Sequence, residues 1–187
     1  NYRKVLSDKI LQQGLDSVPK IAAFLWTTLE RIGGRELCSY INEAIRNDKG
    51  PLFDAVVGIC RMINALVVTR GGAVPVAWPP ANETYRGVGM PRKHRGFFTK
   101  GKQYRLNMFC ATSFQKQKAI EFAIANSDNQ KPPTLFILHF DDPPAMGGLG
   151  CKHANYLDGI SALPGEGEFL MAPYSTFTVD NNPDWGT

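Results

Sequence analysis

The sequence predicts an α+β fold in which N-terminal helices are followed by a mainly antiparallel β core. Apolar residues recur at three- and four-residue steps through the first 70 residues, which is the period of an amphipathic helix. Residues 71–80 then contain two consecutive glycines and three prolines, and a helix cannot continue through them. Short runs rich in β-branched and aromatic residues follow. This order of helices and strands is typical of α+β proteins.

Three segments of the first 70 residues carry the helical period, and we expect helices over residues 10–25, 36–46 and 51–66. Pro19 predicts a break after Val18, because proline cannot donate the hydrogen bond that a helix interior requires. Pro51 and Asp54 suit the start of the third helix, where proline is tolerated and a carboxylate faces the positive end of the helix dipole.

The second half of the chain alternates strand signals with loops. We expect strands over Glu83–Val88, Gln103–Thr112, Thr134–His139, Glu168–Met171 and Thr176–Val179. One helix, Gln115–Ala125, is expected between the second and third strands. The stretch Asp141–Gly150 holds two prolines and three glycines, so we expect a mobile loop there.

Length and composition indicate one compact domain over residues 1–187, with a helical part (1–70) and a β-rich part (80–187). No apolar run approaches the roughly 20 residues that span a bilayer, so we expect no membrane-spanning segment. The net charge of +4 is too small to imply nucleic acid by itself.

The cysteines and histidines show no metal-binding spacing, because no Cys-x-x-Cys pair occurs and only three histidines are present. We therefore expect no metal. The four cysteines would suffice for two disulfides, but we favour buried free thiols. All of them except Cys151 lie in apolar segments, where a thiol packs as a small hydrophobic group.

The first segment with possible chemistry is Arg86-Gly87 at a predicted strand. A planar guanidinium there can reach a phosphate, while the glycine backbone can approach a ring or an amide. Taken alone, the arginine is explained better by a surface salt bridge.

The second segment ends in Ala111-Thr112-Ser113-Phe114. Strand alternation places Ala111 and Ser113 on one face and Thr112 and Phe114 on the other. Hydroxyl side chains at a strand end can orient a neighbouring carboxylate. Serine and threonine also favour such positions for local hydrogen bonding, so this signal is weak alone.

The third segment contains Glu166-Gly167-Glu168. If it is extended, both carboxylates lie on one face, roughly 6 to 7 Å apart. Two like charges at that distance repel, which raises the proton affinity of one of them. A pair on its own is more typical of a solvated strand edge.

Together the three segments resemble the Arg–Ser–Glu class of mono-ADP-ribosyltransferases. The arginine precedes Ser113 by 27 residues, and Glu166 follows after another 53. Tyr40–Arg46 is similar to the family's helical tyrosine–asparagine–arginine segment, and Ser161–Val179 is similar to its closing strands. The resemblance covers roughly residues 40–180 and implies a two-sheet, ADP-ribosyltransferase-like core that binds NAD.

The resemblance implies an enzyme that cleaves NAD between nicotinamide and ribose and passes ADP-ribose to a protein side chain, with no metal. Glu168 would hold a ribose hydroxyl and stabilise the cation that forms there. Glu166 would orient and partly deprotonate the acceptor, with arginine favoured. Arg86 would clamp the NAD phosphates, and Gly87 would offer its backbone to the nicotinamide amide.

The resemblance also implies that Thr112 binds NAD and that one aromatic ring, from Phe114 or Tyr156, stacks on the nicotinamide. Either ring is equally suited to the core. One departure concerns Ala111, where the family usually has a serine that helps to hold the catalytic glutamate. Ser113, on the same strand face, is the candidate to replace that serine. Loss of one such hydrogen bond costs about 1 kcal/mol, which predicts a slower enzyme.

Two other functions stay open. Ala111 favours a relative with an impaired site, which would bind NAD or a partner protein without turnover. The basic segment Arg92–Arg105 is explained best by a solvated loop, although it is also suited to an acidic target surface, to the NAD phosphates or to nucleic acid. Nucleic acid is disfavoured, because Phe97 and Phe98 form no series on which bases would stack.

The N-terminus shows no secretory signal peptide, and the cysteines lie mostly in apolar segments. Within the resembled family, these features favour a bacterial effector over a disulfide-stabilised surface enzyme. We therefore expect a secreted effector that modifies a host protein in the host cytoplasm, with no membrane partner.

Overall fold

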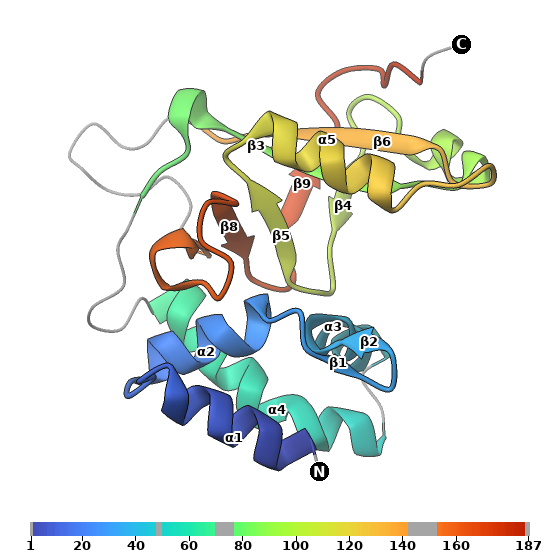
Figure 1. Ribbon diagram of the computed structural model, residues 1–187. Helices are drawn as coiled ribbons and strands as arrows, with labels where there is room; N and C mark the ends of the chain where they lie inside the picture. Colours follow the sequence, from blue (N-terminus) through green and yellow to red (C-terminus); the bar gives the residue numbers. More distant parts are fainter. Residues whose placement is uncertain (1, 48–49, 70–76, 142–152, 186–187) are drawn as a thin grey trace.

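The computed structural model describes residues 2–47, 50–69, 77–141 and 153–185. Helices from the first 69 residues form one end of the molecule, and antiparallel strands with one further helix form the other (Figure 1). The α+β prediction, with N-terminal helices before a mainly antiparallel core, is therefore confirmed. The β strands belong to one large sheet and two small ones.

The N-terminal part contains α1 (Tyr2–Gln12), α2 (Val18–Thr27), α3 (Leu37–Asn47) and α4 (Pro51–Asn64). The predicted break after Val18 is wrong. Helix α1 already ends at Gln12, and Val18 and Pro19 both lie in the first turn of α2. The N–H groups of a first turn have no partner within the helix, so proline costs nothing there. A short hairpin between α2 and α3, β1 (Arg31–Ile32) with β2 (Arg35–Glu36), was not predicted.

Helix α4 continues through a π-helical turn, Ala65–Thr69, into one helix of 19 residues. By length and composition alone this helix could cross a membrane, so the sequence expectation of no such segment was too strong. In the structure it packs against α2 and α3 and buries Val56, Ile63 and Leu66. The side-chain amide of Asn155 donates to the Leu66 carbonyl oxygen at 2.9 Å and ties this turn to the sheet.

The main sheet has the strand order β6-β3-β5-β8-β7. Its strands are β3 (Glu83–Gly89), β5 (Cys110–Ser113), β6 (Pro133–His139), β7 (Ala154–Tyr156) and β8 (Glu168–Met171). Strands β4 (Gln103–Arg105) and β9 (Thr176–Thr178) form a second, two-stranded sheet. Short 3₁₀ turns occur at η2 (Pro80–Asn82), η3 (Arg92–Phe97) and η4 (Asp158–Ile160).

The single strand predicted over Gln103–Thr112 is wrong, because this segment forms β4 and β5, which belong to different sheets. Leu106 still pairs with the second sheet through Ser175 and Tyr174, and the chain then crosses to the main sheet. The crossing places Phe109 in the core beside the helices. The segment Gln103–Thr112 has strand propensity throughout, but the burial of the Phe109 ring against the helices divides it into two strands.

Both faces of the main sheet are covered. On β8, Leu170 joins the core shared with helices α2 to α4, whereas Phe169 and Met171 join a second core on the opposite face. This alternation follows the two-residue period of a strand. The sheet is therefore positioned rigidly against the helices at the strand that carries Glu168.

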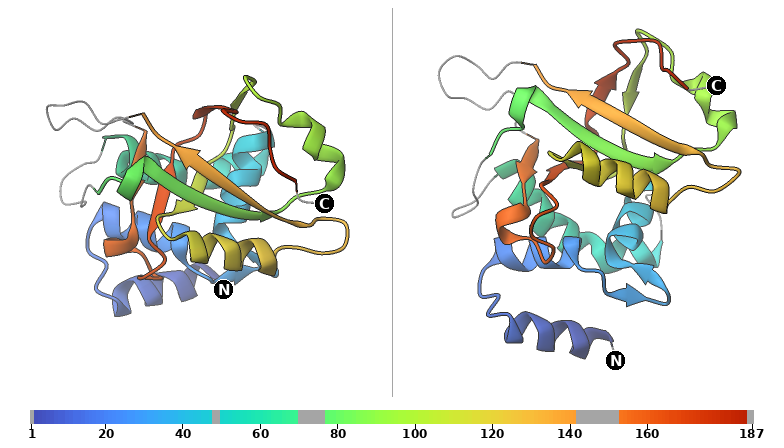
Figure 2. Two further views of the ribbon diagram at one scale, coloured as in Figure 1. Left: turned by 90° about the horizontal axis from the view of Figure 1, so that it is seen from above. Right: turned by 45° about the horizontal axis from the view of Figure 1, so that its top comes forward.

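Helix α5 (Lys116–Ala125) lies across β3 and β6 (Figures 1 and 2). Its backbone comes so close to β3 that a Cβ atom added at Gly87 would lie 1.7 Å from the Ala119 carbonyl oxygen. A Cβ at Gly89 would lie 2.0 Å from the Asn126 carbonyl oxygen. The two glycines therefore set the distance between helix and sheet.

The described cysteines carry free thiols, as predicted. Cys110 is buried, but Cys38 and Cys60 are only half-buried, so the expected full burial is wrong for these two. Desolvation, aided by the nearby Glu36 carboxylate, raises the pKa of the Cys38 thiol to about 11. Cys151 and residues 142–150 of the predicted mobile loop lie outside the described residues.

Candidate active site

Glu168 is the first residue of β8 and is a buried carboxyl group, with 9% of its surface exposed. It pairs with Ser113 across the β5–β8 ladder, so the two side chains start from the same face of the sheet. The indole Nε1–H of Trp26 in α2 donates to its Oε1 at 2.7 Å. Desolvation raises the pKa of Glu168 to about 7, although the indole N–H opposes this shift by favouring the carboxylate.

The turn before β8 is held by one carboxylate, that of Asp158 in η4. Its Oδ1 accepts hydrogen bonds from the backbone N–H groups of Gly165 at 2.9 Å and Gly167 at 2.8 Å. The Phe114 N–H donates to the Gly167 carbonyl oxygen at 2.8 Å. Gly167 has φ 60°, which a residue with a side chain rarely adopts. The turn is therefore built for glycine and fixed on two sides.

Glu166 does not continue the strand, because Gly167 is in the left-handed region and β8 begins only at Glu168. The extended Glu166–Glu168 conformation, with both carboxylates on one face, is thus not observed. Glu166 instead lines a hollow of about 180 Å³ on the α5 side with Lys118, Glu121, Phe122 and Ala125. Desolvation raises its pKa, and the Lys118 charge opposes this shift.

Ser113 does not hold the Glu168 carboxylate. Its Oγ–H donates to the Glu166 carbonyl oxygen at 2.5 Å, and its Oγ accepts from the Gln115 N–H at 2.9 Å. A hydroxyl has one proton to donate, so this arrangement cannot also supply a donor to an ionised Glu168. The prediction that Ser113 replaces the missing hydroxyl of position 111 is therefore not supported. Ser113 instead positions the backbone between the two glutamates.

Arg86 lies where β3 and β5 separate. The β3–β5 ladder has one register pair, Tyr85 with Ser113, and beyond it the Arg86 Nη1 donates to the Ala111 carbonyl oxygen at 2.5 Å. Its charge favours the ionised form of Glu168, opposing the rise in that pKa. Arg86 therefore lies within electrostatic reach of the carboxylate. Its predicted contact with NAD phosphates stays a prediction.

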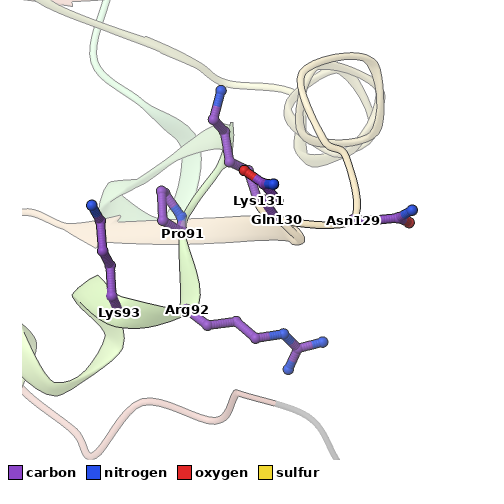
Figure 3. Close-up of a pocket in the computed structure, with 6 residues that line it drawn as sticks. All are labelled: Pro91, Arg92, Lys93, Asn129, Gln130 and Lys131. Carbon is purple, nitrogen blue, oxygen red and sulfur yellow. The ribbon is translucent and has the colours of Figure 1, made fainter.

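Arg86, Ser113 and Glu168 lie on the adjoining strands β3, β5 and β8, and Glu166 lies in the turn before β8. Two hollows lie among the described residues, and neither is lined by all four of these side chains. The larger hollow, of about 410 Å³, lies elsewhere, between the η3 turn and the segment before β6 (Figure 3). The smaller one contains Glu166 only. The geometry thus assembles the charged groups, and neither of these two hollows marks an NAD cleft around them.

The two aromatic candidates lie against each other. The rings of Phe114 and Tyr156 are stacked, with centroids 4.7 Å apart and an interplanar angle of 13°. The choice between them stays open. The Thr112 hydroxyl donates to the Phe169 carbonyl oxygen at 2.9 Å and is buried, and Gly87 is covered by α5. Both have structural roles, and their NAD contacts stay predictions.

Two site residues, Trp26 and Asp158, were not identified from the sequence. Trp26 directly follows the helix predicted over residues 10–25, and its partner Glu168 lies 142 residues away. Asn42, in the Tyr40–Arg46 segment, has a definite role: its side-chain amide donates to the Phe109 carbonyl oxygen at 3.2 Å and accepts from the Phe109 N–H at 2.9 Å. Among the described residues, no three His, Cys, Asp or Glu side chains form a metal-binding group.

No family model matches the chain, and no curated protein sequence matches it. Among solved structures, it is similar to the ADP-ribosyltransferase Vis of Vibrio splendidus in complex with agmatine, with a TM-score of 0.62, 15% identity, and coverage of 87% of this chain and 66% of Vis. It is also similar to the ADP-ribosyltransferase HopU1 of Pseudomonas syringae pv. tomato, with a TM-score of 0.60, 16% identity, and coverage of 86% of this chain and 68% of HopU1. The third is C3stau2 of S. aureus, solved with NAD, with a TM-score of 0.54, 16% identity, and coverage of 92% of this chain and 83% of C3stau2.

The chain thus spans just under two thirds of the length of Vis. At these identities the likeness concerns the fold, and it is consistent across proteins from different bacteria. The chain has the fold of bacterial ADP-ribosyltransferases, which confirms the resemblance seen in the sequence at the level of the fold.

Proposed function

We propose that this protein is a mono-ADP-ribosyltransferase that uses NAD to modify a protein side chain. The observation that carries the proposal is Glu168, a buried carboxyl group at a strand end, held by one hydrogen-bond donor and within electrostatic reach of Arg86. Buried carboxyl groups of raised pKa concentrate at functional sites. The ADP-ribosyltransferase fold, together with the order of the Arg86, Ser113 and Glu166–Glu168 motifs, supports this reaction over others.

In the proposed reaction, the bond between the ribose C1′ and the nicotinamide nitrogen breaks, and nicotinamide leaves with the electron pair. Positive charge develops on the ribose, and the ionised Glu168 stabilises this charge more than it stabilises the neutral ground state. Arg86 would hold the phosphates. The acceptor nitrogen then bonds to C1′ and releases a proton, which Glu166 would take.

We infer that arginine is the favoured acceptor. Vis was solved with agmatine, which carries a guanidinium group, and C3stau2 was solved with NAD. A carboxylate at position 166 suits a guanidinium, because it can orient this group through two parallel hydrogen bonds. The neighbour Vis is named a toxin, which supports a toxin or effector role for this chain.

Glu166→Ala is expected to abolish transfer to protein while leaving NAD hydrolysis measurable, because water needs no side chain to orient it as a guanidinium does. The measurement is labelled NAD incubated with mixed lysate proteins, with released nicotinamide quantified in parallel. Glu121→Ala removes a neighbouring carboxylate from the same hollow and serves as the control, with both activities retained. Equal loss of both activities in Glu166→Ala would contradict the assigned role.

The basic segment Arg92–Arg105 is expected to contact the protein target. It contains six lysines and arginines and no acidic residue, and Arg92 and Lys93 line the larger hollow together with Lys131 (Figure 3). The rings of Phe97, Phe98 and Tyr104 pack on one another, with centroids 4.6 to 5.7 Å apart, and do not stand apart as platforms for bases.

The variant Arg92→Glu with Lys93→Glu should therefore reduce protein modification about tenfold at low salt and leave NAD hydrolysis unchanged. Raising the ionic strength should reduce the difference. The control is Lys4→Glu with Arg61→Glu, which makes the same charge change on exposed residues of helices α1 and α4. An equal effect of both double variants would show that the segment acts only through the net charge of the protein and does not contact the target.

A catalytically impaired relative, which binds NAD or a protein without turnover, is the second candidate, and Ala111 is the observation that favours it. This relative would leave no label on any lysate protein and release no nicotinamide, yet NAD would raise its melting temperature.

A further inference from the structure

The site lacks the hydroxyl that would be expected beside Glu168. Ala111 and Ser113 lie on the same face of the sheet as Glu168, since Ala111 pairs with Leu170 and Ser113 with Glu168. Ala111 has no donor, and the Ser113 proton is used by the Glu166 carbonyl oxygen. The donor that the carboxylate does have comes from the helical part, through the indole N–H of Trp26.

We propose that Trp26 is a positioning residue for Glu168, and that its indole N–H replaces the hydrogen bond that a serine at position 111 would supply. This inference rests on the proposed function. The indole N–H donates to Oε1, which leaves the second oxygen of the carboxylate available to accept the ribose hydroxyl.

The position of the Trp26 ring is itself fixed. Trp26 is 5% exposed, and its ring packs edge-on against Phe109, with centroids 5.3 Å apart. The backbone of Phe109 is held by both ends of the Asn42 side-chain amide. The adjacent Thr27 accepts from the Ala162 N–H at 2.8 Å, in the loop before Glu166. Helix α2 thus aligns both the carboxylate and the loop that leads to it.

The charges around Glu168 show what the indole N–H does. Glu166 and Asp158 disfavour the ionised carboxylate, whereas Arg86 favours it more weakly than the indole does. The Cys38 thiol of α3 also lies within electrostatic reach, and its raised pKa keeps it neutral near pH 7. Without the indole N–H, Arg86 is the main group that still opposes the effect of burial on the pKa of Glu168. The pKa therefore rises further, and the carboxyl group keeps its proton to higher pH.

Trp26→Phe keeps a ring against Phe109 and removes the donor. We expect kcat for NAD hydrolysis to fall about ten- to a hundredfold with KM nearly unchanged, and the acidic limb of the pH profile to move to higher pH. Trp78→Phe is the matched control, because the Trp78 Nε1 donates to Asn82 at 2.6 Å, in the second core. It should leave kcat and the acidic limb unchanged.

Ala111→Ser in the Trp26→Phe background should restore activity and return the acidic limb towards the wild-type pH. The contact is also tested without turnover: the indole N–H resonance of Trp26 should titrate near pH 7 in the wild type and lose this titration in Glu168→Gln. An unchanged acidic limb in Trp26→Phe, or an indole resonance that does not titrate, would overturn the inference. A wild type that cleaves no NAD would instead refute the proposed function, and the indole titration would still decide the contact.

Discussion

Glu168→Gln is expected to abolish both NAD cleavage and transfer to protein, while it makes the folded state more stable above pH 7. An amide of the same shape still accepts from the Trp26 indole, but it carries no charge to stabilise the cation on the ribose. Removal of such an electrostatic group costs on the order of a thousandfold in kcat or more. The loss of NAD cleavage should exceed that of Trp26→Phe and of Glu166→Ala.

The stability effect follows from the direction of the pKa shift. The pKa of Glu168 is raised from 4.5 to about 7 in the folded state, so the folded protein binds this proton more tightly than the unfolded chain does. The resulting stabilisation is present below pH 4.5 and is lost as the pH rises through 7. The difference amounts to about 3 kcal/mol above both pKa values. Glutamine avoids this cost but must satisfy its own N–H groups, so we expect a net gain of about 1 to 3 kcal/mol at pH 8.

Chemical denaturation at pH 5 and pH 8 measures this effect. Glu168→Gln should match the wild type more closely at pH 5 and exceed it at pH 8. Glu121→Gln, at a carboxylate on the exposed side of α5, provides the comparison and should show little difference at either pH. An active Glu168→Gln enzyme would remove the basis of the proposed mechanism.

Gly87→Ala is expected to destabilise the folded protein strongly. The new Cβ would lie 1.7 Å from the Ala119 carbonyl oxygen and 2.6 Å from the Ala123 backbone nitrogen, and both atoms belong to the backbone of α5. Backbone atoms of a helix cannot rotate aside as a side chain can. The helix would therefore have to move off β3, and we expect a loss of more than about 4 kcal/mol or failure to fold.

Gly58→Ala in α4 is the matched control, because no atom lies within 4 Å of its added Cβ. Alanine has the higher helix propensity, so this substitution should stabilise the protein by up to about 1 kcal/mol. Melting temperature and the far-ultraviolet circular dichroism of the two variants make the comparison. A folded Gly87→Ala protein with wild-type stability would show that α5 is not seated on β3 as described.

The sequence was sufficient wherever local pattern and final environment agree. Strand β8 was predicted at its observed bounds, and β3, β6 and α5 were within one residue of theirs. The three-residue strand β7 was missed, because so short a run has little pattern. The run from Gln103 to Thr112 was divided because Phe109 is buried among the helices, and this preference arises from packing and not from propensity.

The same limit explains what was missed in the site. The sequence nominated Glu168 and Arg86 through the order of motifs, and these roles stay predictions, but it placed Ser113 beside the carboxylate on strand alternation alone. Alternation gives the face of a side chain and does not give its hydrogen-bond partner. The conformation of Gly167 and the approach of Trp26 depend on contacts distant in sequence, and a single sequence does not reveal them.

The indole-to-carboxylate contact between α2 and β8 also bears on how this protein can be inhibited or divided. A fragment containing only residues 80–187 would hold both glutamates and the arginine yet lack the donor that aligns one of them. Under the proposed function, a small molecule that binds between α2 and β8 would inhibit the reaction without competing with NAD. Its selectivity would depend on the contact between Trp26 and Glu168, and the molecule would not need to mimic the nucleotide.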